Sequence, residues 1–242
     1  NGMVCSIDHL ASSAGVSALR KGGTAADAAI ATSAVLAVTS QHMCGVGGDL
    51  WALIHVPGEP RPFALNASGH SGSGADLGAL RRDGFNEMPF HRDPRSIPVP
   101  GCVDGWLALH QRFGRLPLEE ILADSIDLAN RGFPLSPDCA QATKLLVDTD
   151  NTNDYFPSGP PQPGQLIRRS GLGEALKEIA RGGREPFYEG TFGEELILFG
   201  AGEYRPEDLT TTQANWVEPL STEAFDQRIW SLAKGTSVSA SI

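Results

Sequence analysis

The side chains with the widest choice of chemistry in this sequence are its four cysteines and six histidines. No two cysteines form a C-x-x-C pair, so their spacing does not support a zinc ribbon or a redox dithiol. No two histidines have the His-x-x-x-His or His-Glu-x-x-His spacing of a helical metal site. We therefore expect no metal and no cofactor, although Asp8, His9, His42 and Asp49 could in principle converge.

Two sites could provide a nucleophile. Cys102 falls at a predicted helix start, where the pKa of a thiol can drop, but a cysteine hydrolase also needs a histidine beside it. Since free cysteines are most often small buried hydrophobes, we expect Cys102 to be one. Ser71 lies in a Gly-His-Ser-Gly-Ser run that lacks the second glycine of the Gly-x-Ser-x-Gly motif and follows a predicted hairpin, which argues against a serine hydrolase. The histidines that could serve Cys102 are His9, His42, His70 and His110.

Residues 41–49 form a glycine-rich stretch between a predicted helix and a predicted strand. Glycine lets the backbone approach a ligand or a second chain closely. The stretch lacks the Gly-x-Gly-x-x-Gly and Gly-Lys-Ser/Thr patterns, and it precedes a strand rather than a helix. It therefore predicts one wall of a cleft and does not predict a nucleotide site.

The elements that would position these residues have clear local signals. Apolar periodicity predicts helices, and two apolar runs joined by a Pro/Gly-rich turn predict a β-hairpin. Thr24 and Asp27 have capping-box spacing at the start of an alanine-rich helix that should be buried. The order of elements is typical of an α+β fold with antiparallel strands, in one domain over residues 1–242. The predicted elements are a strand at 3–7, helices at 10–19, 25–38, 103–113, 118–130 and 172–180, and hairpin strands at 50–56 and 63–67, with a loop over 85–98.

Composition excludes several classes of partner. The chain has 242 residues and a formal net charge of −10, which argues against nucleic acid and against an anionic membrane surface. No run reaches the roughly 18 apolar residues of a membrane span. The first residues do not form a signal peptide, although one could have been removed, so the compartment stays open.

Several segments, taken in order, resemble the large subunit of the γ-glutamyltransferase family of N-terminal-nucleophile hydrolases, and in particular its acylase and amidohydrolase branch. Each segment is short, but their order along the chain makes the set specific. The matching segments are residues 3–6 with 9–12, 19–29, 42–49, 99–101 with 105–106, 113–117, 132–134, 187–190 and 208–209.

The resemblance implies a four-layer αββα sandwich that a second, small chain completes. It also implies a proenzyme that cleaves itself, so that the new N-terminal threonine of the small chain becomes the nucleophile. The α-amino group of that threonine, with an ordinary pKa near 8, would act as general base. Two backbone N–H groups of the small chain would stabilise the oxyanion, and the reaction would be acyl transfer from a small amide.

The sequence departs from the family at the expected substrate site. The γ-glutamyl enzymes carry an arginine shortly after the second hairpin strand, where it binds the substrate α-carboxylate. Here Ser68 stands near that position, close to Asn66, and we expect these two residues to contact the substrate. A hydroxyl cannot replace a bidentate arginine, so an acyl group other than γ-glutamyl is favoured. Another arginine could still bind a carboxylate, and the candidates are Arg81, Arg82, Arg92 and Arg95.

Two alternatives and one remote match remain open at this stage. The protein could be a γ-glutamyltransferase with a non-standard carboxylate site, or a degenerate subunit that only binds small molecules. The last residues loosely resemble the strand that begins at the nucleophilic threonine, in which case Thr236 would match it.

Overall fold

The computed structural model describes residues 2–89, 93–146, 149, 152–156 and 159–232. The contacts divide the chain into two compact units, each built from two separate stretches of sequence. The first unit comprises residues 1–46 and 107–192, and the second comprises residues 47–106 and 193–242. The single domain over residues 1–242 stays a prediction.

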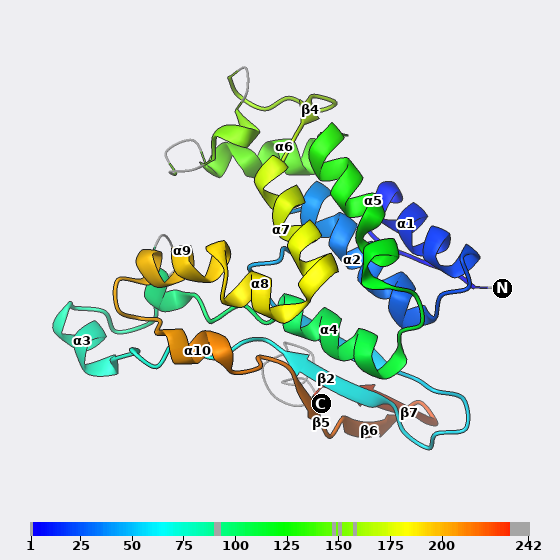
Figure 1. Ribbon diagram of the computed structural model, residues 1–242. Coiled ribbons are helices and arrows are strands. Elements are labelled where there is room, and N and C mark those ends of the chain that lie inside the picture. The colour runs from blue at the N-terminus through cyan, green and yellow to red at the C-terminus, as the bar shows by residue number, and fades with distance from the viewer. Residues whose placement is uncertain (1, 90–92, 147–148, 150–151, 157–158, 233–242) are drawn as a thin grey trace. The chain divides into compact units, whose positions relative to one another are not determined.

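The first unit is mainly helical. In it α1 (His9–Arg20) packs on α2 (Ala25–Thr39), α2 packs on α5 (Leu118–Arg131), and α5 packs on α7 (Ser170–Gly182) (Figure 1). The four longest helices predicted within this unit are therefore confirmed. Its other elements are α6 (Pro137–Thr143), α8 (Arg184–Tyr188), 3-10 turns at Lys144–Leu146 and Asn153–Tyr155, and the antiparallel pair β3 (Phe133–Pro134) and β4 (Leu166–Ile167).

Side-chain caps determine where the first two helices begin. Asp8 is the N-cap of α1 and accepts hydrogen bonds from the backbone of Leu10 and Ala11. Thr24 and Asp27 form the predicted capping box at the start of α2. Each cap satisfies backbone N–H groups that have no partner within the helix, which stabilises the helix by about 1 kcal/mol.

Small residues let α1 and α2 approach closely. A side-chain carbon added at Gly15 would lie 2.3 Å from Oγ1 of Thr32 and 3.1 Å from the carbonyl oxygen of Ala28. Ile30, Val35 and Val38 of α2 are almost fully buried. The prediction that this alanine-rich helix is buried is confirmed for most of its length.

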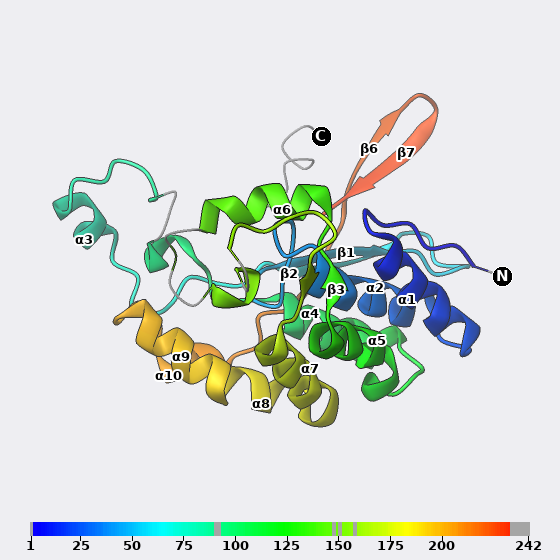
Figure 2. The same ribbon diagram turned by 90° about the horizontal axis from the view of Figure 1, so that it is seen from above.

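The second unit contains the antiparallel sheet β1-β2-β5, with β1 (Leu50–Ile54) and β2 (Phe63–Ala67) forming the predicted hairpin (Figure 2). Asn66 of β2 lies opposite Trp51 of β1 and Asn215 of β5. The remaining elements of this unit are β5 (Asn215–Val217), the hairpin of β6 (Leu220–Ala224) and β7 (Gln227–Ser231), α3 (Leu77–Arg82), α10 (Pro206–Thr210) and a 3-10 turn at Pro94–Ser96.

Two helices contain residues of both units: α4 (Cys102–Phe113) and α9 (Thr191–Gly200). The helix predicted at 103–113 is α4. The short elements α3, α6 and α10 and the β6–β7 hairpin were not predicted, because segments of five to seven residues carry too little periodicity. None of the described helices is long and apolar enough to cross a bilayer.

The strand predicted at residues 3–7 is wrong for this chain. The segment has no regular secondary structure and no strand beside it among the described residues. A β-prone sequence becomes a strand only where a second strand supplies the hydrogen-bond ladder.

Candidate functional site

The glycine-rich stretch ends in a fixed contact with the start of α4. The carbonyl oxygen of Gly48 accepts hydrogen bonds from the backbone N–H groups of Gly101 and Cys102, at 2.9 and 3.0 Å. Asp49 accepts a hydrogen bond from Nε1 of Trp51 at 3.0 Å. The carboxylate of Asp49 therefore fixes the side chain of Trp51 at the start of β1. The hydrogen bonds to Gly48 hold the end of the glycine-rich stretch against the start of α4.

The end of β2 lies in main-chain contact with the residues that precede α4. A side-chain carbon at Gly101 would lie 2.1 Å from the carbonyl oxygen of Ala67. At Gly69, where φ is +82°, such a carbon would lie 1.9 Å from the carbonyl oxygen of Val99. Only glycine fits at either position, because any side chain would push the two segments apart.

Asn66 and Ser68, the two predicted substrate-binding residues, lie together at this end of β2. The backbone N–H of Ser68 donates to Oδ1 of Asn66 at 2.9 Å, which is a local turn closed by a side chain. The hydroxyl of Ser68 lies 3.4 Å from the carbonyl oxygen of Gly69. Both residues are half-buried, so the site presents uncharged polar groups.

A buried network that the sequence did not reveal holds the loop after Ser68. Asp104, which is 3% exposed, accepts a hydrogen bond from the backbone N–H of Gln213 at 2.7 Å. Oε1 of Gln213 accepts from the backbone N–H of His70 at 3.1 Å and lies 2.8 Å from Nδ1 of the same histidine. His70 is thereby fixed two residues beyond Ser68.

The network also determines the tautomer of His70. Nε2 of Gln213 donates to the carbonyl oxygens of Asp208 and Thr211, at 3.0 and 2.8 Å, so Oε1 of Gln213 must be the acceptor. Nδ1 of His70 therefore carries a proton. The exposed imidazole then offers Nε2 to a ligand.

The described arginines that could bind a substrate carboxylate, Arg95 on the predicted loop and Arg81 and Arg82 at the end of α3, all have partners within this chain. Arg95 forms ion pairs of 2.6 Å with Asp93 and with Asp83, and its hydrogen bond to Asp93 is the main reason that the pKa of Arg95 is raised. Arg82 pairs with Asp76 at 3.1 Å, and Arg81 donates to the carbonyl oxygens of Phe85 and Asn86. Arg92 lies outside the described residues.

The same arginine lowers the pKa of Asp93. The hydrogen bond from the Arg95 side chain is the largest cause, and it outweighs the effect of burial. Arg95 thus serves as the partner of a carboxylate of its own chain, and it is not free for a substrate carboxylate.

Comparison with known proteins identifies the family of this chain. The family model described as gamma-glutamyltranspeptidase matches residues 11–242. The chain belongs to the gamma-glutamyltranspeptidase family. The resemblance predicted from the ordered segments is therefore confirmed.

Curated relatives differ in the chemistry for which they are named. The chain is 37% identical to the glutathione hydrolase-like YwrD proenzyme of Bacillus subtilis, over 91% of this chain and 43% of that protein. It is 34% identical to the oxamate amidohydrolase proenzyme of Klebsiella pneumoniae, over 98% of this chain and 47% of that protein. The chain thus spans about half the length of these relatives.

Solved structures of the family share the fold. The gamma-glutamyltranspeptidase of Pseudomonas nitroreducens superposes with a TM-score of 0.88 at 28% identity, over 99% of this chain and 73% of that chain. The cephalosporin acylase of Bacillus halodurans superposes with a TM-score of 0.84 at 31% identity, over 91% of this chain and 44% of that chain. These matches confirm the predicted α+β fold of the N-terminal-nucleophile hydrolases.

Of the other sequence candidates, Cys102 and His110 do not join the site of this family member, whereas His70 lies beside it. Cys102 is 4% exposed, so its thiol has no access to a substrate. His70 is bonded to Gln213, and Nε2 of His110 lies 2.7 Å from the carbonyl oxygen of Leu116. Burial also raises the pKa of the Cys44 thiol in the glycine-rich stretch, which disfavours its thiolate.

The structure gives no support for a metal site among the described residues, and it does not test the match of Thr236 to the nucleophile. Among the residues described by the structure, no group of three or more His, Cys, Asp or Glu side chains could hold a metal ion. Asp8 caps α1 instead. Thr236 lies outside the described residues, so its match to the nucleophile remains a prediction.

Sequence reasoning missed Asp104, Gln213 and His70 as a unit. The pair Asp104 and Gln213 is separated by 109 positions, and His70 and Gln213 by 143. The one available signal was the position of Asp104 between Gly101 and Gly105, at a helix start where a buried acid requires a partner.

Proposed function

We propose that this chain is the large-chain part of a self-cleaving amide hydrolase or acylase that acts on a small amide whose acyl group is not γ-glutamyl. One observation carries the proposal within the family: the end of β2 presents Ser68 and Asn66, which are uncharged, and no arginine. A γ-glutamyl donor has an α-carboxylate that needs a charge-assisted, bidentate partner. The described arginines of the neighbouring loop are occupied by their own contacts.

The proposed chemistry is acyl transfer in two steps. The hydroxyl oxygen of the N-terminal threonine of the second chain attacks the amide carbon, and its proton passes to the α-amino group of the same residue. The C–N bond then breaks, and that proton leaves with the amine. Water repeats the sequence on the acyl ester and releases the acid. Backbone N–H groups would stabilise the oxyanion in both steps.

This chain would supply the binding side of the reaction. Asn66 and Ser68 would contact the acyl group, and His70 would add a hydrogen-bonding imidazole ring that Gln213 holds in place. Preorganised polar groups of this kind lower the cost of orienting a small amide. Two relatives are named for chemistry of this kind, the oxamate amidohydrolase of Klebsiella pneumoniae and an acylase of Pseudomonas.

The proposal is tested with the complete gene product and a panel of amides. Simple acyl p-nitroanilides, such as the acetyl and butyryl compounds, whose acyl group carries no carboxylate, should be turned over with a kcat/KM at least about 10-fold above that for γ-glutamyl p-nitroanilide. Highest activity on the γ-glutamyl compound would support the alternative, a γ-glutamyltransferase with a different carboxylate site, which the name of the YwrD relative favours. If no amide is turned over and no threonine is covalently labelled, the remaining hypothesis is a degenerate subunit that only binds small molecules.

A substitution of Ser68, which stands where the γ-glutamyl enzymes carry an arginine, makes the test more specific. Ser68→Arg should raise kcat/KM for the γ-glutamyl anilide about 10-fold or more relative to the butyryl anilide, whose acyl group has no carboxylate, since a charge-assisted bond contributes roughly 1.5–3 kcal/mol. Ser71→Arg is the matched control, because it adds the same charge at an exposed position three residues along the chain. Equal changes in both variants would show that net charge alone is responsible.

A further inference from the structure

Glu203 is a buried acid whose carboxyl group has no hydrogen-bond partner. The residue is 8% exposed and lies in the turn between α9 and α10. Its backbone is fixed, because its carbonyl oxygen accepts from the N–H of Gly74 at 3.0 Å and its N–H donates to the carbonyl oxygen of Gly200 at 2.9 Å. Within the described part of the chain, its carboxyl oxygens form neither a hydrogen bond nor an ion pair, although buried acids ordinarily have such a partner.

The carboxyl group of Glu203 faces an open pocket of about 470 Å³ within the second unit, which we call the Glu203 pocket. Its oxygens are not among the described polar atoms that are sealed from solvent without a partner, so they reach the pocket that the residue lines. The hydroxyl of Tyr204 lies 2.8 and 2.7 Å from the carbonyl oxygens of Pro94 and Ile97, which fixes two walls of the pocket. The pocket is lined by Gly74, Asp76, Ala79, residues 93–95 and residues 200–203.

The other charged groups of the Glu203 pocket already have partners. Asp76 pairs with Arg82 at 3.1 Å. Arg95 pairs with Asp93 and with a second aspartate, both at 2.6 Å. The lining residues thus include three carboxylates and one guanidinium that two aspartates already share, so the pocket is negative and Glu203 has no ion pair of its own.

The surroundings of Glu203 disfavour its ionised form. Burial raises the pKa of this carboxyl from its ordinary value, and it outweighs the opposite effect of Arg95. A cation with N–H donors would supply both the charge and the hydrogen bonds that the carboxylate lacks.

We infer that the Glu203 pocket binds a small primary amine in its ammonium form. The ammonium group would donate to the carboxylate of Glu203, and the alkyl part would lie against Ala79 and the turn after α9. A metal ion does not fit, because no group of three or more His, Cys, Asp or Glu side chains among the described residues could hold one. An anion does not fit a pocket with three carboxylates. The inference goes beyond the proposed function and does not depend on it.

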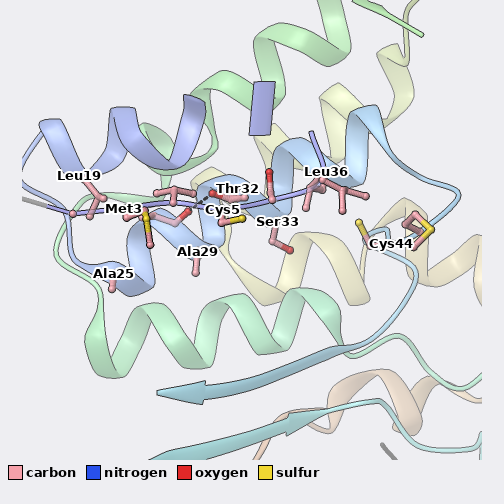
Figure 3. A pocket seen from close by; sticks show the side chains of 15 residues that line it. Met3, Cys5, Leu19, Ala25, Ala29, Thr32, Ser33, Leu36 and Cys44 are labelled. Atoms are coloured by element: carbon pink, nitrogen blue, oxygen red, sulfur yellow. Dashed lines mark hydrogen bonds between the residues drawn. The ribbon is translucent and has the colours of Figure 1, made fainter. Parts of the chain in front are cut away.

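A pocket of the first unit, of about 810 Å³ along α2, has a different chemistry. Figure 3 shows the side chains of Met3, Cys5, Ala25 and Ala29 among those that line it, and none of its lining residues is charged. An apolar pocket of this kind can take up the alkyl part of a ligand whatever its polar group. The probes must therefore differ in charge and share one alkyl chain.

Calorimetric titration of the complete gene product with n-butylamine tests the inference at about pH 7, where a primary amine is protonated. Glu203→Gln keeps the shape of the side chain and removes its charge, so it should weaken the binding of butylamine about 10-fold or more. Butyrate and n-butanol should bind the unchanged protein more weakly than butylamine does, and Glu203→Gln should not weaken them. Equal affinity of the unchanged protein and Glu203→Gln for butylamine would overturn the inference.

Two controls separate the pocket from a general effect of charge. Glu207→Gln removes the same charge at an exposed position four residues along the chain, and it should change the affinity for butylamine by less than about 2-fold. Ala79→Leu fills the pocket without changing any charge and should weaken butylamine, whereas Ala75→Leu, at an exposed position outside the lining, should not. Equal affinities of the two leucine variants would contradict binding in this pocket.

Photolabelling locates the bound amine directly. An alkylamine that carries a diazirine should, on irradiation of the complete gene product, label peptides that contain residues 74–79, 93–95 or 200–203, and excess butylamine should prevent the labelling. Labelling confined to the end of β2 or to a second chain would place the amine elsewhere and overturn the inference. Amide turnover is measured separately with the anilides, so the failure of either proposal leaves the other standing.

Discussion

At the scale of single residues, Asp27 joins two segments of the first unit. Its carboxylate is fully buried, caps α2 through the backbone N–H of Thr24 at 2.8 Å, and accepts two bonds from the backbone N–H of Arg115 at 3.0 and 3.1 Å. The N–H of Leu116 lies 3.4 Å away. A buried carboxylate is tolerated here because backbone N–H donors satisfy it.

The first prediction concerns this residue. Asp27→Ala removes the cap and deprives the backbone N–H groups of Thr24 and Arg115 of their acceptor, so the free energy of unfolding should fall by about 3 kcal/mol. Urea unfolding of the complete protein measures the change. The control is Asp124→Ala at an exposed position on α5, which should change it by less than about 0.5 kcal/mol. Equal effects would contradict this account of Asp27.

The sequence predicts that Asp27 caps α2, but it does not predict the contact of Asp27 with the backbone of Arg115. The spacing of Thr24 and Asp27 predicts the capping box, because both partners lie within one helical turn. Arg115 is 88 positions from Asp27, and no local pattern indicates that its backbone would reach the same carboxylate.

At the scale of elements, the candidate site depends on how closely β2 and α4 approach. Gly69 and Gly101 allow backbone to meet backbone, and Gly105 of α4 would place an added carbon 2.9 Å from Cβ of Ala67 and of Leu50. Three glycines thus hold Ser68 at the start of α4. A bulkier residue at any of them would shift the substrate-binding residues relative to the network of Asp104.

Gly69→Ala should damage both stability and activity. Alanine there would adopt a left-handed φ of +82° and also clash with the carbonyl oxygen of Val99, so we expect a loss of about 2 kcal/mol or more in stability. The kcat/KM of the complete enzyme should fall about 10-fold or more, since displacement of a binding loop by about 1 Å has effects of this size.

Gly58→Ala separates the two causes. Gly58 has a comparable φ of +93° in the β1–β2 turn, but nothing lies within 4 Å of an added carbon. This control should lose about 1 kcal/mol in stability and keep its kcat/KM. Equal losses in the two variants, measured by thermal unfolding and by initial rates, would contradict the close approach at Gly69.

At the scale of the whole molecule, the chain spans less than half the length of the two relatives compared above, both of which are named proenzymes. It belongs to the gamma-glutamyltranspeptidase family, and the match to these two relatives extends over at least 91% of this chain. Near the candidate site, Cys102 is buried, and Ser68 has no base bonded to it among its described contacts. The nucleophile is therefore expected on the second chain.

At the scale of the whole molecule, we predict that the gene product cleaves itself into two chains. Mass spectrometry of the freshly purified gene product should show one long polypeptide that converts with time into two chains, the second beginning with threonine. Substitution of that threonine by alanine should leave the precursor uncut and abolish amide turnover, because the same side chain attacks the backbone and the substrate. A single uncut chain with full amidase activity would contradict the prediction.

The sequence by itself determined the local elements and the family. Helices with a strong period and a cap, such as α2 and α5, and the hairpin of β1 and β2 follow from neighbours a few positions apart, and they were predicted close to their final bounds. The ordered motifs identified the family, whereas the substitution of arginine by Ser68 stays a prediction.

Only the tertiary structure decided how the site is built. It brought His70, Gln213 and Asp104 together, occupied Arg95 with two aspartates, and left residues 3–7 extended without a partner strand. Each of these outcomes depends on where the chain returns after many residues, or on what a second chain contributes. Local propensity carries no information about such distant partners, because it is set by the energies of neighbouring residues alone.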